Sequence, residues 1–150
     1  LIARQIGTTH RVTLASPAYL AKHPTPKTPQ DLSQHNCLLF NLLSSQNQWV
    51  YEKNGARHSV RITGNAQSNN SESVREMVLT GLGIALSPLW LFHDDLKAGR
   101  VIALLQDYTP QPLPIHAVSA PNRRQSARVK AFVDYMADAL AQAPELQAVK

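Results

Sequence analysis

The chain has 150 residues, of which 43% are hydrophobic and 17% charged, and it carries a formal net charge of +5. It is long enough for one domain or two small lobes around a sizeable core, with a composition ordinary for a soluble globular protein. No apolar run approaches the roughly 20 residues of a membrane-spanning helix, and no secretion signal opens the sequence. We therefore expect a cytoplasmic protein without membrane contact, which agrees with a single cysteine and no internal disulfide.

The basic balance raises the question of nucleic-acid binding. Lysines and arginines are spread along the chain, with one loose cluster at Arg123, Arg124, Arg128 and Lys130. No aromatic residues interleave with this cluster, as a platform for stacked bases would require. We interpret the charge as a solvated surface.

The predicted elements alternate between strands and helices from the start. Residues 11–15 form a short strand, after which Ser16 caps a helix that starts at Pro17. Thr28 and Asp31 make a capping box for the next short helix.

A buried strand at residues 37–40 precedes a β-hairpin. The hairpin strands, residues 48–53 and 57–62, flank Asn54 and Gly55, a strong turn signal.

The most informative segment, residues 65–88, is predicted as a strand, a polar turn, a helix, a second strand and a helix start. Its helix shows apolar residues at helical spacing, with Arg75 on the opposite, polar face. Ser73 and Glu76 fit a capping box. The candidate N-cap residues are Asn69, Asn70, Ser71 and Ser73.

Either Gly81 or Gly83 ends this helix. Residues 84–86 follow as a short buried strand, and Ser87 with Pro88 starts the next helix.

The rest of the chain continues the alternation. The helix from Pro88 runs to Ala98 and is closed by Gly99, and strands follow at residues 101–105 and, after a proline-rich linker, at 115–118. A long helix over residues 126–141 ends the pattern. The fold class is therefore α/β, with an antiparallel hairpin inserted.

Catalytic chemistry is not indicated. The six histidines show no metal-ligand spacing, and Cys37 lies in an apolar run typical of a core residue rather than a nucleophile. Asp94 and Asp95 are adjacent on a helix, so their side chains point in different directions and do not form a catalytic acid pair. We expect them instead to interact with the positive N-terminal end of the helix that follows. The sequence predicts no enzyme, no metal site and no cofactor.

Three strand-to-helix junctions stand out instead. They contain Ser16, the run from Asn69 to Ser71, and Ser87 with Pro88. Each places hydroxyl or amide groups and free backbone N–H groups at a strand end, where α/β proteins bind carboxylates and other small polar molecules. The alternative is that Ser16 and Ser87 only cap their own helices.

At these junctions the chain resembles the effector domains of LysR-type transcriptional regulators. The likeness covers the chain to about residue 141, through motifs that occur in the family's order. These motifs are residues 11–20, 28–37, 69–88, 94–100, 114–118 and 128–135.

The resemblance implies a type II periplasmic-binding-protein-like fold of two lobes with a small-molecule effector between them. Residues 12–111 would form the complete second lobe, and residues 1–11 and 112–150 the crossing strands, a remnant of the first lobe and the C-terminal helix. Because the sequence starts without a methionine, we expect a piece of a longer protein. The parent would be a homo-oligomer that binds promoter DNA through a helix-turn-helix domain absent here.

The expected effector-binding residues on this reading are Ser16, Asn69, Asn70, Ser71, Ser87 and Pro88. Two other functions stay open: a solute-binding protein of a transport system, which shares the fold, and a small hydrolase using Cys37 or a histidine.

The last helix carries an apolar face that the absent part of the first lobe would cover. We expect this face to pair with a second copy or to fold back on the second lobe, because exposed apolar stripes are rare in soluble monomers. The face consists of Val129, Phe132, Val133, Met136 and Leu140.

Overall fold

In a computed structural model of the protein, which describes residues 1–43, 47–120 and 126–146, the chain divides into two compact units. Unit 1 combines residues 1–10 with the chain from Pro112 onward, and unit 2 is Arg11–Gln111. No helix in the described ranges is long and apolar enough to cross a membrane.

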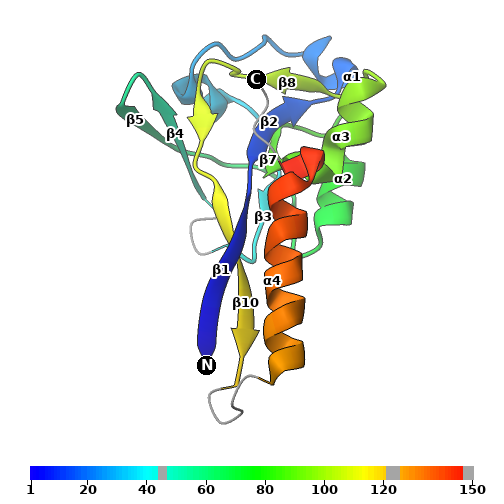
Figure 1. Cartoon of the computed structure of the whole chain (residues 1–150). Coiled ribbons are helices and arrows are strands. Elements are labelled where there is room, and N and C mark those ends of the chain that lie inside the picture. Colours follow the sequence, from blue (N-terminus) through cyan, green and yellow to red (C-terminus); the bar gives the residue numbers. More distant parts are fainter. Residues whose placement is uncertain (44–46, 121–125, 147–150) are drawn as a thin grey trace. The chain divides into compact units, whose positions relative to one another are not determined.

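Unit 2 contains most of the secondary structure (Figure 1). Its strands are β2 (Arg11–Ala15), β3 (Leu39–Phe40), β4 (Gln48–Lys53), β5 (Ala56–Arg61), β6 (Gln67–Ser68), β7 (Ala85–Pro88), β8 (Ile102–Leu104) and β9 (Thr109–Pro110). Its helices are α1 (Pro17–Leu20), the 3₁₀ helix η1 (Pro29–Gln34), α2 (Ser71–Leu79) and α3 (Leu89–Lys97).

The centre of unit 2 is a set of strands that mixes two directions. Strand β2 lies between β7 and β8 and is antiparallel to both. Beyond β7, Cys37 pairs in parallel with Ile84, and β3 pairs in parallel with β6. Strands β7, β3 and β6 therefore run in one direction, and β2 runs against them.

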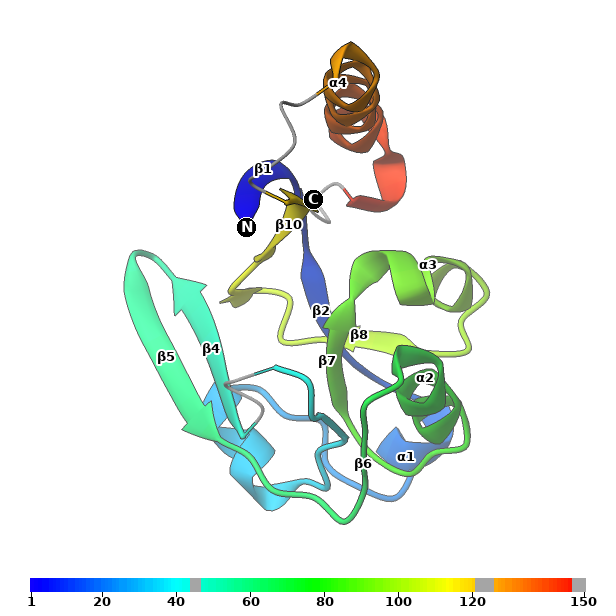
Figure 2. The same ribbon diagram turned by 90° about the horizontal axis from the view of Figure 1, so that it is seen from below.

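These central strands are buried on both faces. Val12 and Leu14 belong to a core cluster with residues of α2 and α3, whereas the Thr13 hydroxyl between them lies 2.8 Å from the Tyr51 hydroxyl of β4. This alternation is what a two-fold side-chain period requires of a strand covered on both sides. Figure 2 shows α2 and α3 on one side of β7 and the β4–β5 hairpin on the other.

Several local predictions are confirmed. Asn54 and Gly55 have φ of 51° and 75°, as the hairpin turn needs, and Gly99 ends α3 with φ of 71°. Gly81, with φ of 82°, ends α2, so the choice between Gly81 and Gly83 falls on Gly81.

The predicted helix caps are correct in α1 and η1 but not in α2. The Ser16 hydroxyl accepts from the backbone N–H of Tyr19 at 3.2 Å, and Thr28 and Asp31 form the expected capping box. In α2 the N-cap is Asn70, one of the four candidates, and the helix begins before the proposed Ser73–Glu76 box. The box prediction was wrong because Asn70 caps the helix three residues earlier.

Two predictions about α3 and its neighbours also fail. Asp95 was expected to interact with the N-terminal end of a following helix, but it lies within α3 and is 1% exposed. Arg75, expected to face solvent, donates two hydrogen bonds to Asp95, and Arg100 donates a third. The acidic pair thus contains one buried carboxylate that ties α2, α3 and the turn after α3 together.

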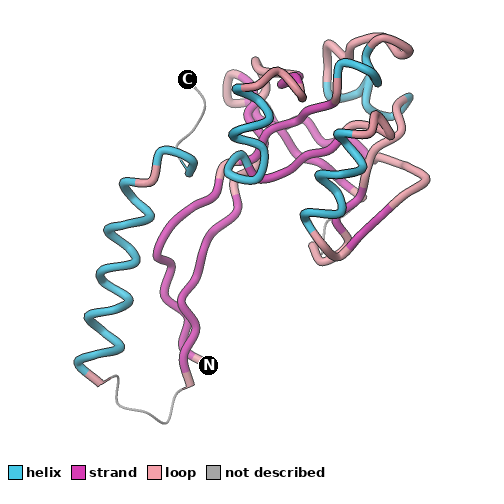
Figure 3. Tube along the Cα trace, turned by 90° about the vertical axis from the view of Figure 1, so that its right-hand side faces the viewer, coloured by secondary structure: helices cyan, strands magenta, loops and turns pink. Residues whose placement is uncertain are grey.

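Unit 1 is an antiparallel strand pair with a long helix beside it (Figure 3). Its elements are β1 (Ile2–Thr9), β10 (Leu113–Ser119), α4 (Ala127–Gln142) and the 3₁₀ helix η2 (Pro144–Leu146). Arg4 of β1 forms an ion pair with Asp134 of α4 at 2.6 Å. The pairing of β1 with β10 is irregular between Gln5 and Gly7, where Leu140 of α4 packs against Gly7.

Helix α4 confirms the predicted long helix, but its apolar face is not buried. Phe132 is 64% and Val129 42% exposed, and no described α4 side chain is buried. The basic residues Arg128 and Lys130 are also exposed, whereas Arg123 and Arg124 of the same predicted cluster lie outside the described residues.

Candidate functional site

The ends of three parallel strands meet at one edge of unit 2. Phe40 at the end of β3 is paired with Ser68 at the end of β6, and Pro88 at the end of β7 is paired with Arg11 at the start of β2. Four neighbouring strands span about 14 Å at 4.7–4.9 Å per strand. We call this edge the strand-end site. It comprises Ser68, Asn69, Asn70, Ser71, Ser87 and Pro88.

Ser16 does not belong to this site, although the sequence predicted it there. Because β2 is antiparallel to β7, Val12 pairs with Ser87, and Ser16 lies beyond the opposite end of β2, about 13 Å further along at 3.3 Å per residue. Ser16 is 2% exposed, and its hydroxyl is occupied by the N–H of Tyr19. It therefore caps α1, as the alternative interpretation held.

Helix α2 offers fewer free donors than the sequence suggested. The side-chain oxygen of Asn70 accepts from the N–H groups of Glu72 and Ser73, at 2.8 and 3.2 Å. Asn69 is exposed, and neither its amide nor the Ser71 hydroxyl has a hydrogen bond to any described residue. The polar groups available at this end of the site are thus side chains rather than the helix terminus.

Ser87 and Pro88 have a different role from the one predicted. Ser87 lies within β7 and does not cap α3, and Pro88 takes the N-cap position without a capping side chain. Ser87 is 4% exposed, and its hydroxyl makes no hydrogen bond within the part of the chain that the structure describes. The N–H groups in the first turn of α3 likewise have no side-chain partner.

Arg11 was predicted only as the start of a strand, and its side chain leaves the sheet on the face of Thr13 and Tyr51, opposite to the side chain of Ser87. Its Nε and Nη2 atoms donate to the Gln111 carbonyl oxygen at 2.9 and 2.7 Å. Burial lowers the pKa of Arg11, and the nearby Tyr51 opposes that shift.

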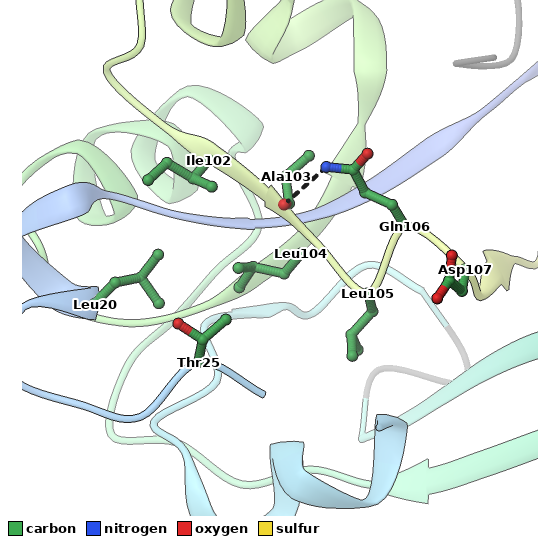
Figure 4. A pocket seen from close by; sticks show the side chains of 8 residues that line it. All are labelled: Leu20, Thr25, Ile102, Ala103, Leu104, Leu105, Gln106 and Asp107. Carbon is green, nitrogen blue, oxygen red and sulfur yellow. Dashed lines mark hydrogen bonds between the residues drawn. The ribbon is translucent and has the colours of Figure 1, made fainter. Parts of the chain in front are cut away.

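A cavity of about 490 Å³ lies at the other edge of unit 2 (Figure 4). It adjoins β8, whose Ile102 pairs with Ala15 at the far end of β2 from Arg11. Asp107 is the one ionisable side chain in its lining, so little is available there to orient a polar ligand. The lining residues are Leu20, Thr25, Ile102, Ala103, Leu104, Leu105, Gln106 and Asp107.

The described residues contain no group of three His, Cys, Asp or Glu side chains placed to hold a metal ion. Cys37 is fully buried, and burial raises the pKa of its thiol to about 12. His35 is also buried, with Nδ1 2.8 Å from the Tyr19 hydroxyl. These side chains are packed in the core and offer no accessible nucleophile and base.

We expect Cys37 to resist thiol reagents in the folded protein. With a pKa of about 12, roughly one thiol in 10⁴ is ionised at pH 8, and only the thiolate attacks a disulfide reagent. Labelling with Ellman's reagent should be negligible in native buffer and complete in urea. Rapid labelling of the native protein would restore Cys37 as a possible nucleophile.

Comparison with known proteins places these features in context. The family described as LysR substrate binding domain matches residues 1–141. The HTH-type transcriptional regulator DmlR of Escherichia coli is 32% identical over 137 residues, 91% of this chain and 44% of DmlR. The regulator CrgA of Neisseria meningitidis is 32% identical over 142 residues, 93% of this chain and 47% of CrgA. The chain thus spans a little under half the length of these relatives.

Solved structures agree with the sequence comparisons. The regulatory domain of CrgA from Neisseria meningitidis superimposes with a TM-score of 0.77 at 29% identity, over 93% of this chain and 68% of that domain. Full-length AphB, a virulence activator of Vibrio cholerae, gives a TM-score of 0.76 at 28% identity, over 93% of this chain and 48% of AphB.

Proposed function

Because the chain belongs to the family of LysR substrate binding domains, we propose that it is the effector-sensing part of a LysR-type transcriptional regulator. Its fold is the type II periplasmic-binding-protein-like fold of such regulatory domains. Unit 2, Arg11–Gln111, corresponds on this proposal to the second lobe of the domain.

The observation that carries the proposal is the chemistry of the strand-end site. Ser87 is 4% exposed, and its hydroxyl, which is not completely buried, has no hydrogen bond to a described residue, so it is open to a further partner. An effector would supply it, with Asn69, Asn70 and Ser71 as further hydrogen-bonding groups and Pro88 as part of the wall. A small polar molecule fits these groups better than an apolar one.

The signal would pass by a shift in population. An effector that binds one conformation of the domain more tightly raises the share of that conformation. DmlR and CrgA are named HTH-type regulators. We propose that the whole protein likewise binds DNA through a helix-turn-helix domain, as a homo-oligomer in the cytoplasm where the DNA lies.

The two alternative functions have no observation in their favour. The relatives described above are transcriptional regulators, not transporters or enzymes. A hydrolase would also need an accessible nucleophile, which the buried, protonated Cys37 does not provide.

A thermal-shift screen of small polar metabolites tests the proposal, because a ligand that favours the folded state raises the melting temperature. We expect Ser87→Ala and Asn69→Ala each to weaken the binding of a confirmed ligand by up to about 10-fold, the worth of one neutral hydrogen bond.

The matched control is Ser59→Ala on β5. The Ser59 hydroxyl accepts from Gln48 at the exposed surface of the hairpin, so its loss should leave ligand affinity unchanged. A ligand whose affinity is the same in all three variants would bind outside the strand-end site.

A further inference from the structure

The two chain segments that join the units run side by side and then part. Strand β1 pairs with β10 as far as Thr9, which is opposite Leu113. Beyond these residues β2 pairs with β7 and β8, whereas β9 pairs with β4. The two segments therefore diverge where they enter unit 2, at Arg11 on one segment and Gln111 on the other.

Prolines leave few backbone donors where the segments diverge. Pro110 and Pro112 have no N–H group, so Gln111 is the single backbone donor among these three residues. The Gln111 N–H donates to the Val50 carbonyl oxygen of β4 at 3.0 Å. Backbone pairing alone therefore fixes residues 110–112 through few hydrogen bonds.

The Arg11 side chain connects the two segments at this point. Its Nε and Nη2 atoms both donate to the Gln111 carbonyl oxygen, at 2.9 and 2.7 Å. Hydrogen bonds from a charged donor are stronger than those between neutral groups, and the planar guanidinium presents both donors in a fixed geometry. Both backbone groups of Gln111 are thus bound within unit 2, the N–H by β4 and the carbonyl by Arg11.

The surroundings of Arg11 favour this contact over a solvated side chain. Arg11 is half-buried, and burial lowers the pKa of its guanidinium. Its side chain lies on the strand face of Thr13, whose hydroxyl is 2.8 Å from the hydroxyl of Tyr51. A cation that loses part of its solvation needs hydrogen-bond acceptors in the protein, and the Gln111 carbonyl is one.

We propose that Arg11 is a positioning residue that clamps the two connecting segments where they enter unit 2 and confines bending between the units to His10 and Pro112. These are the next residues outward, and neither belongs to a strand. The ring of Pro112 fixes its φ, so His10 carries most of the backbone freedom. The clamp needs no ligand and is therefore independent of the proposed function.

Amide hydrogen exchange of the 150-residue chain, followed by NMR, tests the clamp. In Arg11→Met the Gln111 N–H should exchange about 10- to 100-fold faster, the range for losing hydrogen bonds to a charged group. The N–H of Ile84, which donates to the Asn36 carbonyl oxygen in the core, should exchange as before. Arg11→Lys keeps a charged donor but not the planar pair, and should give an intermediate rate at Gln111.

Arg61→Met is the matched control, because it removes a cation from an exposed position opposite Gln48 on the hairpin. It should leave the exchange of Gln111 and Ile84 unchanged. Relaxation of the backbone ¹⁵N nuclei in the unmodified chain locates the bend, with a lower order parameter expected at His10 than at Arg11 and Gln111.

Four results would overturn the proposal. The first is an unchanged Gln111 rate in Arg11→Met. The second is equal acceleration at Gln111 and Ile84, which would show a general loss of stability. The third, equal order parameters at His10, Arg11 and Gln111, would place the bend elsewhere. The fourth needs no variant, so it holds even if Arg11→Met does not fold: an unprotected Arg11 Nε–H in the unmodified chain would show that the clamp is open.

Discussion

Arg75→Met should lower the free energy of unfolding by about 3 kcal/mol, the lower end of the range for removing one partner of a buried ion pair. Asp95 is 1% exposed, and Arg75 donates to both of its carboxylate oxygens, at 2.7 and 2.9 Å. After the substitution the buried Asp95 carboxylate still pairs with Arg100, and this remaining ion pair limits the loss of stability. Urea denaturation followed by circular dichroism measures it.

The double variant Arg75→Met with Asp95→Leu should recover much of this loss, because it removes the stranded charge as well. Arg61→Met, on an exposed position, should stay within about 0.5 kcal/mol of the unmodified chain. A double variant no more stable than Arg75→Met would show that packing of the arginine stem, not charge, stabilises the α2–α3 contact.

The cost of Arg75→Met should also depend on pH. Burial pushes the pKa of Asp95 upward, but hydrogen bonds and charges from Arg75 and Arg100 outweigh it, so the pKa lies below its ordinary value. The carboxylate therefore stabilises the fold above the unfolded pKa of about 3.9, and this stability is lost as pH falls through the folded pKa. The difference between variant and unmodified chain should be largest near pH 7 and smaller at pH 3.

Gly83→Ala and Gly64→Ala should each destabilise the protein by about 3 kcal/mol or more, at or above the usual limit for overpacking. A Cβ on Gly64 would lie 2.8 Å from the carbonyl carbon of Cys37 and closer still to its oxygen, and one on Gly83 would collide with the Asn36 carbonyl. Both neighbours are backbone atoms, which cannot turn aside as a side chain would.

Gly7→Ala is the control for these two variants. A Cβ there would meet Leu140 at an ordinary 3.4 Å, so the change should cost less than about 1 kcal/mol. Urea midpoints of the three variants test the argument together. If Gly83→Ala lowered the stability no more than Gly7→Ala does, the close approach of the Asn36 backbone would not be the reason for a glycine at position 83.

Local elements were readable from the sequence because local chemistry forms them. The hairpin turn at Asn54 and Gly55, the Ser16 cap and the end of α3 at Gly99 depend on residues within a few positions of each other. The predicted Ser73–Glu76 capping box was wrong for a reason that is also local. Asn70 and Ser73 are both favourable N-cap residues, and residue preference alone does not say which of the two begins the helix.

The composition of the site was harder to predict, because it depends on strand direction. Nothing local to Ser16 or Ser87 reveals that β2 runs against β7, and that pairing separates the two serines. The same pairing puts Ser87 on the face of Val12, toward α2 and α3, and Arg11 on the face of Thr13, toward Tyr51.

The sequence by itself determined the α/β class, the family and most helix and strand positions, since periodicity, caps and turns are encoded within short windows. Only the tertiary structure decided which strand ends meet, that Asp95 is buried between Arg75 and Arg100, and that Arg11 binds the Gln111 carbonyl. Those facts depend on contacts between residues far apart in the chain, and one sequence records no such contact.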